Sequence, residues 1–257
     1  MNDNIKIFVL LHAPVELPSC YADRTIYVPM QCGAANNSPI VGTLKDNNGD
    51  NISTLNAKYN EMTAIYWLEK HYQEIGNPEY IGIDHYRRFL HWKKEWLSPK
   101  SVIARKWFSW RTLYNQYEIC HDIRNLDTFI VAFGKRFGAE HSDFKKYWKS
   151  HFFHICNIFI MHRDQFHRYA TFIIDCINLI RELEICNAFT PTNDAYQART
   201  PSFLLEEMTS YWMWHESRMK TIKLIPSHIT HFNIENSING GATLKKEGFL
   251  WQLRKAY

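Results

Sequence analysis

The stretch that decides the fold reads YIGIDHYRRFL and occupies residues 80–90. Tyr80, Ile81 and Ile83 form a short apolar run after the turn signal at residues 76–78, which is typical of a central strand in an α/β sheet. The polarity then changes abruptly at Asp84. Because ligands of open α/β sheets bind beyond the carboxyl ends of the strands, this change indicates a binding edge for anions.

The adjacent residues Arg87 and Arg88 leave two interpretations open. Neighbouring side chains of an extended segment point to opposite faces, so one guanidinium could face a ligand while the other pairs with an internal carboxylate. Alternatively, both arginines form structural salt bridges near the end of the sheet, since a buried charge needs a partner.

The composition predicts a globular protein with a substantial core. The 257 residues suffice for one large α/β domain or two small ones, and 46% of them are hydrophobic. No apolar run reaches the length of about 18 residues that crosses a membrane. Residues 1–11 read as a first strand and not as a signal peptide. The six cysteines lack C-x-x-C spacing, which predicts reduced residues of a cytoplasmic protein and neither zinc ligands nor disulfides.

The net charge of +4 is spread unevenly along the chain. Residues 91–111 hold six Lys or Arg against Glu95 alone, interleaved with five aromatic residues. Basic and aromatic residues together suit an anionic membrane surface or a nucleic acid. A solvated and partly packed excursion is the simpler interpretation of the same stretch.

Periodicity and turn signals predict alternating strands and helices in one α/β domain. We expect strands over residues 5–11, 25–29, 80–83, 126–132, 156–161 and 221–226. We expect helices over residues 58–75, 163–184 and 202–215, and a helical segment within 144–153. Residues 91–125 are poorly periodic and partly helical. Residues 227–257 look irregular, with a short basic amphipathic end at residues 249–255.

Several blocks accompany the 80–90 stretch in a fixed order. They are residues 27–35, residues 46–53 with Asn56, residues 59–67, residues 157–161 and residues 203–206. Together they resemble a family of bacterial glycosyltransferases from capsule and lipopolysaccharide gene clusters, long catalogued as a domain of unknown function. Some members are galactofuranosyltransferases. The resemblance covers most of residues 5–225 and is weak in the 91–117 stretch and in the last 30 residues.

The resemblance implies a GT-A-like single-domain sandwich with a mixed, mostly parallel central sheet flanked by helices. Residues 1–90 would bind a nucleotide sugar, residues 120–226 an acceptor, and residues 227–257 would form an irregular basic tail. The implied donor is a UDP-sugar, with galactofuranose or galactose as the first choice of hexose. The implied acceptor is a glycan or lipid-linked glycan at the inner face of the cytoplasmic membrane, where the protein could make peripheral contact with anionic lipid.

Sugar transfer requires that the charge developing on the diphosphate leaving group be neutralised. Most GT-A enzymes use a divalent metal on an Asp-x-Asp motif, and only the first Asp is present here, as Asp84. Arg87 or Arg88 could replace the metal, because a guanidinium binds phosphate oxygens bidentately. Alternatively, Asp84 and His85 could hold Mn²⁺ or Mg²⁺. We favour the arginines, and His85 is otherwise a satisfied histidine at a strand end.

Further polar or small residues are candidates for the donor site. The uracil and ribose are expected over the ends of the first two strands, and other candidates flank a helix N-terminus, where the dipole favours anions. Loop and helix-cap roles are the alternative for the Asp and Asn residues. Glu61 could instead pair with Arg87 or Arg88. The donor candidates are His12, Gly33, Ala34, Asp50, Asn51, Asn56, Asn60, His85, Tyr86 and Asn157.

An inverting enzyme also needs a base for the acceptor hydroxyl. Glu206 is the best candidate, because an apolar context such as Phe203-Leu204-Leu205 can raise the pKa of a carboxyl group. The family match falls on Glu206 and not on Glu207. Asp194 and Asp84 are reserve candidates, and an ordinary glutamate in the first turn of a helix is the alternative.

Two rival functions follow from the same sequence. A nucleic-acid-binding module could use the basic and aromatic stretch 91–117, and it would bind in a salt-dependent manner. An inactive scaffold of a polysaccharide assembly complex is the other rival. The polar clusters lie at predicted strand ends, which favours a transferase with no nucleic-acid partner.

Overall fold

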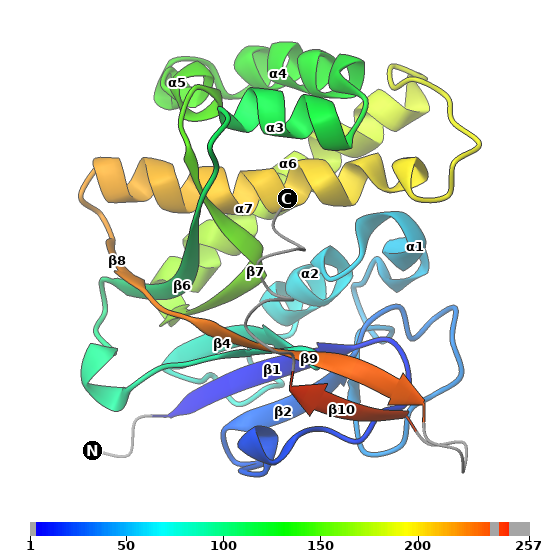
Figure 1. The fold of residues 1–257 in the computed structure, drawn as a ribbon, viewed down its shortest axis with the longest axis vertical. Coiled ribbons are helices and arrows are strands. Elements are labelled where there is room, and N and C mark those ends of the chain that lie inside the picture. The colour runs from blue at the N-terminus through cyan, green and yellow to red at the C-terminus, as the bar shows by residue number, and fades with distance from the viewer. Residues whose placement is uncertain (1–3, 237–241, 247–257) are drawn as a thin grey trace.

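The computed structural model describes residues 4–236 and 242–246. Its centre is a parallel set of strands in the order β3-β2-β1-β4, of which β2, β1 and β4 are labelled in Figure 1. These strands are β1 (Ile5–Leu11), β2 (Tyr27–Gln31), β3 (Leu44–Lys45) and β4 (Tyr80–His85). β1 is apolar on both faces because both of its faces are covered, as the near-continuous hydrophobic run predicts.

The free edge of β4 is shared by two antiparallel strands, which makes the sheet mixed. β7 (Phe152–His162) pairs with residues 80–83, and β5 (Arg88–Leu90) pairs with His85 at the end of β4. β6 (Ser101–Phe108) pairs with β7 and with β8 (Lys223–Pro226). Beyond β5 lie β9 (Ile229–Asn236) and β10 (Ala242–Lys246). The end of β4 is therefore a branch point in the sheet.

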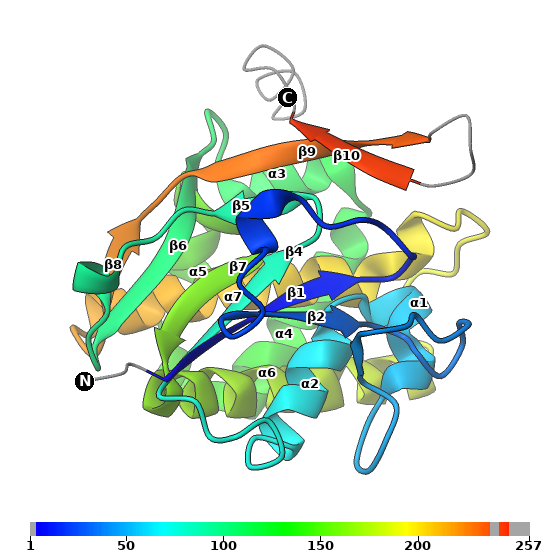
Figure 2. The ribbon, with the colours of Figure 1, turned by 90° about the horizontal axis from the view of Figure 1, so that it is seen from below.

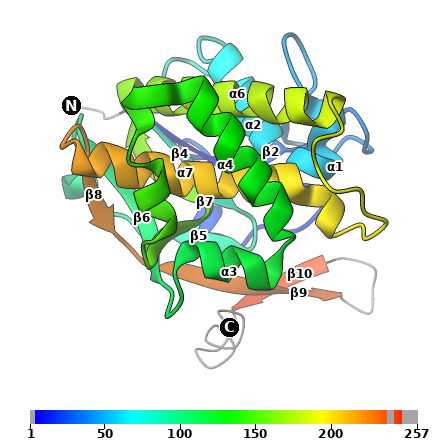
Figure 3. The same cartoon turned by 90° about the horizontal axis from the view of Figure 1, so that it is seen from above.

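The helices gather on one side of the sheet, as Figures 1 and 3 show. The nearer ones are α1 (Asn56–Tyr59), α2 (Met62–Lys70), α6 (Arg163–Ile185) and α7 (Thr200–Arg218). Farther out lie α3 (Leu113–Cys120), α4 (Ile123–Phe137) and α5 (Phe144–Trp148). Phe8 and Leu10 of β1 point into this main core, which also includes Trp67 and Phe166.

The opposite face of the sheet has a smaller core. Ile7, Val9 and Leu11 alternate with the residues that face the helices, and they pack with Tyr21 and Tyr86. The segment between β1 and β2 and its short 3₁₀ turn (Ser19–Tyr21) lie on this side (Figure 2). Among the described residues, none of the helices combines the length and the apolarity that crossing a membrane would require.

The predicted strand over residues 126–132 is wrong, because this segment lies within α4. Its apolar run suits a strand by composition, but the buried residues Leu126, Phe129 and Phe133 follow helical spacing while Val131 is 58% exposed. Asp122 caps the helix by accepting a hydrogen bond from the Arg124 backbone N–H (3.0 Å).

The predicted helix over residues 58–75 is broken. It forms α1 and α2, which are separated at Asn60, where φ is +48°. An asparagine tolerates this left-handed region better than most residues. Asn60 and Glu61 therefore lie between the two helices, at the edge of the sheet. Both residues line the cavity described in the next section.

Two other segments also differ from expectation. The 91–125 region is partly helical as expected, through α3, but it also contains the strand β6, whose partner β7 is about 50 residues away in sequence and so leaves no local signal. The 227–257 tail was expected to be irregular, but β9 pairs with β5 through Arg88 and His231, and β10 pairs with β9. The predicted amphipathic end at residues 249–255 lies outside the described residues.

Candidate active site

A cavity of about 700 Å³ opens at the carboxyl ends of β1 and β4. The turn between β4 and β5, the break between α1 and α2, and the start of α7 form its walls. This is the edge at which α/β sheets bind ligands. Nine residues predicted from sequence line it, namely His12, Asn56, Asn60, Glu61, His85, Tyr86, Arg87, Arg88 and Glu206.

The turn that carries the two arginines is held by buried groups behind it. The Asp84 carboxylate accepts hydrogen bonds from the backbone N–H groups of His85 and Leu90, both at 3.0 Å. The Tyr21 hydroxyl contacts the carbonyl oxygens of His85 (2.8 Å) and Arg88 (2.7 Å). Burial raises the pKa of Asp84 well above its ordinary value. Asp84 therefore shapes the turn and does not face the cavity.

The hypothesis of a metal held by Asp84 and His85 does not fit these residues. Both Asp84 oxygens are engaged by the backbone of the β4–β5 turn. Within residues 4–236 and 242–246, no group of three or more His, Cys, Asp or Glu side chains is arranged to hold a metal ion. A divalent cation needs several oxygen or nitrogen ligands at once.

His85 lines the cavity and carries a buried hydrogen-bond donor without a partner among the described residues. Arg88 Nη1 lies 3.2 Å from His85 Nδ1, and a guanidinium can only donate, so Nδ1 accepts and Nε2 carries the proton. The buried Nε2 has no hydrogen-bond partner among the described residues. Burial, followed by the charges of Arg88 and Arg87, holds the pKa of His85 well below its ordinary value. His85 is thus a neutral imidazole with an unused N–H.

Three guanidinium groups line the cavity. Arg87 lies over the ring of Tyr86 (5.2 Å to its centroid), and Arg88 contacts His85. In the described parts of the chain, neither forms an ion pair with a carboxylate, so the salt-bridge interpretation of these arginines finds no partner there. The third is Arg199, which precedes α7 and lies 5.7 Å from the ring centroids of Tyr196 and Phe203. The cavity is therefore rich in positive charge.

Two carboxylates reach the same cavity and are held by one irregularity of β7. Cys156 and Asn157 have φ values of +68° and +51°, which interrupt the strand as a bulge. The Cys156 backbone N–H donates to Glu206 Oε1 (2.6 Å), and Asn157 Nδ2 donates to Glu61 Oε1 (2.7 Å). Burial, followed by the charge of Glu61, raises the pKa of Glu206. Such strained backbone is common at functional sites.

The turn after β2 supports the part of the cavity wall that includes Cys32 and Asn56. Buried Asp46 accepts from the backbone N–H groups of Gly33 (2.9 Å) and Ala34 (3.0 Å), and from the hydroxyls of Ser53 and Thr63 (2.6 Å each). Gly33 has φ +66°, and a Cβ there would lie 2.5 Å from Asn56 Oδ1, so only glycine fits. Gly33 and Ala34 themselves are not among the residues that line the cavity.

We expect Asp46→Asn to destabilise the protein by about 2 kcal/mol, because an amide cannot accept all four hydrogen bonds and leaves buried donors unsatisfied. Urea denaturation followed by circular dichroism measures the change. Asp50→Asn is the matched control, since the exposed side chain of Asp50 contacts the Tyr66 hydroxyl (2.9 Å) and Lys70 (3.6 Å) and accepts no backbone hydrogen bond among the described residues. Equal stability of Asp46→Asn and the wild type would contradict this role for Asp46.

The remaining predicted residues lie outside the cavity lining. Asp50 contacts α2 as described, and Asn51 stabilises its own loop by accepting from the Ser53 backbone N–H (3.1 Å). Exposed Asp194 accepts from the Tyr196 backbone N–H (2.8 Å). Asn157 is 2% exposed and lies behind Glu61, and its Oδ1 has no partner among the described residues.

Arg199, Ser202 and Cys156 line the cavity but were missed from sequence. Ser202 Oγ lies 2.6 Å from the side-chain amide of Asn60. With the amide oxygen turned toward Arg199, this oxygen also accepts from Arg199 Nη2 (2.5 Å). The only sequence signal for Arg199 and Ser202 is their place just before the 203–206 block. The bulge at Cys156 has no sequence signal either, because its left-handed positions are not occupied by glycine.

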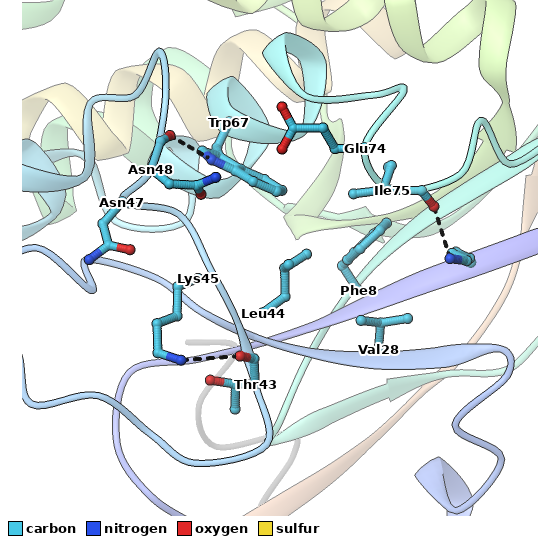
Figure 4. A pocket seen from close by; sticks show the side chains of 11 residues that line it. Phe8, Val28, Thr43, Leu44, Lys45, Asn47, Asn48, Trp67, Glu74 and Ile75 are labelled. Atoms are coloured by element: carbon cyan, nitrogen blue, oxygen red, sulfur yellow. Dashed lines mark hydrogen bonds between the residues drawn. The ribbon is translucent and has the colours of Figure 1, made fainter.

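A second cavity of about 510 Å³ lies apart from the first (Figure 4). Phe8, Val28, Trp67 and Ile75 give it apolar walls. Lys6 also lines it and donates from Nζ to the Ile75 carbonyl oxygen (2.8 Å). None of the residues predicted for the donor site or for catalysis lines this cavity.

Comparison with known proteins agrees with the predicted fold. A family model described as "Domain of unknown function (DUF4422)" matches residues 6–217. A solved structure described as the apo form of the bifunctional glycosyltransferase WbbM superposes with a TM-score of 0.71 at 21% sequence identity. The match covers 91% of this chain and 47% of that one, so this chain spans about half its length. A search among curated proteins gave no match. The likeness confirms the predicted α/β fold class with its mixed sheet and helices.

Proposed function

This chain belongs to the DUF4422 family, and from that premise we propose that it is a glycosyltransferase that moves a hexose from a nucleoside-diphosphate sugar to a hydroxyl acceptor. The likeness to a structure described as a glycosyltransferase supports the class of reaction. The observation that carries the proposal is the cavity itself. Three guanidiniums, a neutral histidine and two carboxylates line it together at the carboxyl edge of the sheet.

Arg87, Arg88 and Arg199 would neutralise the diphosphate as the bond to the sugar breaks. A guanidinium binds phosphate oxygens with two parallel N–H groups, and its charge is permanent. The unpartnered Nε2–H of His85 would donate to a phosphate or sugar oxygen in the same region. These donors are in place before the substrate binds, which is the arrangement that stabilises developing negative charge most effectively.

Glu206 would take the proton from the acceptor hydroxyl in an inverting displacement. Glu206 lines the cavity from α7, and the Arg87–Arg88 turn lines it from the sheet, so a sugar bound between these elements would have a carboxylate available to its acceptor. A raised pKa brings a carboxylate closer to the working pH and improves it as a base. Glu61, held by Asn157, supplies the neighbouring negative charge.

We further propose a UDP-sugar as the donor, with galactofuranose or galactose as the first hexoses to test. His12, Asn56 and Asn60 line the cavity near the ends of β1 and β2, where a uracil and ribose would fit. The proposed acceptor is a glycan or a lipid-linked glycan of a surface polysaccharide. This part rests on the family resemblance of the sequence blocks.

A donor panel tests the proposal directly. The full chain is incubated with individual UDP-, GDP- and dTDP-sugars, and release of the nucleoside diphosphate is followed by HPLC. We expect release from at least one UDP-hexose, increased by a glycan acceptor. Absence of release from every donor, while UDP also fails to bind in calorimetry, would overturn the proposal.

The pH dependence of kcat/KM provides a second test. A base acts in its deprotonated form, so activity should rise with pH through the pKa of Glu206, which lies above the ordinary value for a carboxyl group. Glu61→Gln removes the neighbouring charge and should therefore shift this rise toward lower pH. The Gln side chain can still accept from Asn157. An unchanged pH profile in Glu61→Gln would show that the charge of Glu61 does not contribute to the pKa that controls activity.

A further inference from the structure

The joined ends of β6 and β7 expose a cluster of aromatic rings. Phe108 and Phe152 are each 43% exposed, and Trp110 is 74% exposed. The centroid of the Phe108 ring lies 5.2 Å from those of Trp110 and Phe152. In Figure 1 this end of the two strands rises from the sheet toward α3 and α5. Three contiguous exposed rings differ from the scattered apolar residues that are normal on a protein surface.

The segments that carry these rings are rich in positive charge. The β6–β7 tip, defined as residues 105–111 and 145–152, contains no Asp or Glu. Backbone bonds join its two segments, from Ser109 N–H to the His151 carbonyl oxygen (2.7 Å). Lys106 Nζ lies 4.1 Å from the centroid of the Phe152 ring. Over the described ranges, no cation of the tip forms an ion pair with a carboxylate. These cations are Arg105, Lys106, Arg111, Lys145, Lys146 and Lys149.

We propose that the β6–β7 tip docks this protein on the surface of a phospholipid bilayer that contains anionic headgroups. Aromatic rings are favoured at the depth of the headgroups, and clustered Lys and Arg are attracted to anionic lipid. Here the rings pack against one another, with Phe108 and Trp110 edge to face at 81°, so they are not spaced to stack successive bases. This arrangement favours lipid over single-stranded nucleic acid.

Only the later part of the basic stretch predicted from sequence contributes to this surface. Trp92 and Trp96 pack against the small core on the other face of the sheet, and Trp92 Nε1 donates to the Tyr27 hydroxyl (3.0 Å). The lysines of α5, more than 30 residues farther along the chain, join the tip instead. The charged and aromatic surface is therefore assembled by the fold.

Docking at the tip would hold the cavity near the bilayer. α3 begins two residues after Arg111, and its eight residues span about 12 Å. The ring of His121, which follows α3, stacks on Phe203 at 3.9 Å, and Phe203 lines the cavity. A lipid-linked acceptor would then be within reach. That consequence rests on the proposed function, whereas docking itself does not.

Co-sedimentation of the full chain with vesicles tests the docking. We expect binding to vesicles of phosphatidylcholine mixed with phosphatidylglycerol, weak binding to phosphatidylcholine alone, and loss of binding at high salt. Trp110→Ser, and Lys106→Glu combined with Arg111→Glu, should each lower the partition coefficient by about tenfold or more. The control pair Val131→Ser and Lys135→Glu changes an exposed apolar residue and an exposed cation on α4, and should bind like the wild type.

Several results would overturn the docking. These are equal binding to neutral and anionic vesicles, tip variants that bind as the wild type does, or tip substitutions that abolish oligonucleotide binding while vesicle binding persists. Circular dichroism verifies that the variants fold. Donor turnover with a soluble acceptor should be unchanged in the tip variants. Vesicle binding without turnover under any condition would reject the proposed function and leave the docking intact.

Discussion

Arg88→Ala should lower turnover of the sugar donor by about 10²-fold or more, because it removes a permanent charge from the place where the diphosphate charge would develop. Arg88 contacts His85 Nδ1, so the substitution also frees that imidazole to change its tautomer. Arg88→Lys should recover only part of the activity, since an ammonium is a point charge and cannot form two parallel hydrogen bonds to a phosphate. Turnover is measured as nucleotide release at saturating donor.

The folding of Arg88→Ala is expected to be preserved. The contact that fixes this residue in the turn is between its backbone carbonyl oxygen and the Tyr21 hydroxyl, and it does not involve the side chain. Arg24→Ala serves as the control, because Arg24 is exposed and lies away from the cavity lining. Calorimetry with UDP should show weaker binding for Arg88→Ala alone. Unchanged UDP affinity together with unchanged turnover would exclude a phosphate-binding role for Arg88.

Glu206→Gln should reduce kcat by about 10²-fold to 10⁴-fold, which is the usual contribution of a general base. The glutamine oxygen can still accept the hydrogen bond from the Cys156 backbone N–H, so the substitution removes the proton acceptor while the bulge of β7 keeps its contact. Donor affinity should change little, since the role proposed for Glu206 is toward the acceptor hydroxyl. Single-turnover measurements separate the two effects.

Glu207→Gln is the matched control for Glu206→Gln. The Glu207 carboxylate accepts a hydrogen bond from the Tyr147 hydroxyl (2.6 Å), and Glu207 does not line the cavity. Burial raises the pKa of Glu207 to about 7, so a raised pKa alone does not make it a base for the reaction. Activity should therefore survive in Glu207→Gln. If Glu206→Gln retained full turnover and Glu61→Gln did not, Glu61 would be the base.

The prediction from sequence was strongest where a signal is local. The apolar runs of β1 and β4 and the long stripe of α6 are properties of the segments themselves, and these elements were placed almost to the residue. The abrupt change of polarity after Ile83 likewise located the wall of the cavity. Nine of the candidate site residues line that cavity because they follow strands or a helix break at one edge of the sheet.

What could not be predicted depends on partners far away in the chain. Residues 126–132 have the composition of a strand, and only packing of Leu126, Phe129 and Phe133 against other helices selects α4. β9 forms because it pairs with β5, which lies more than 130 residues earlier in the sequence. Arg199 reaches the cavity through contacts with Asn60, across the break between α1 and α2. Each of these requires the folded chain.

The bulge in β7 has a consequence for how related sequences can vary. The group that steadies Glu206 at Cys156 is a peptide N–H, which every residue except proline possesses. Exchange of the cysteine side chain therefore leaves this bond available, and an alignment would give no sign of it. The left-handed backbone at Cys156 and Asn157 should instead admit glycine or asparagine most readily. The backbone conformation at this point can thus be conserved among related proteins while the residue types vary.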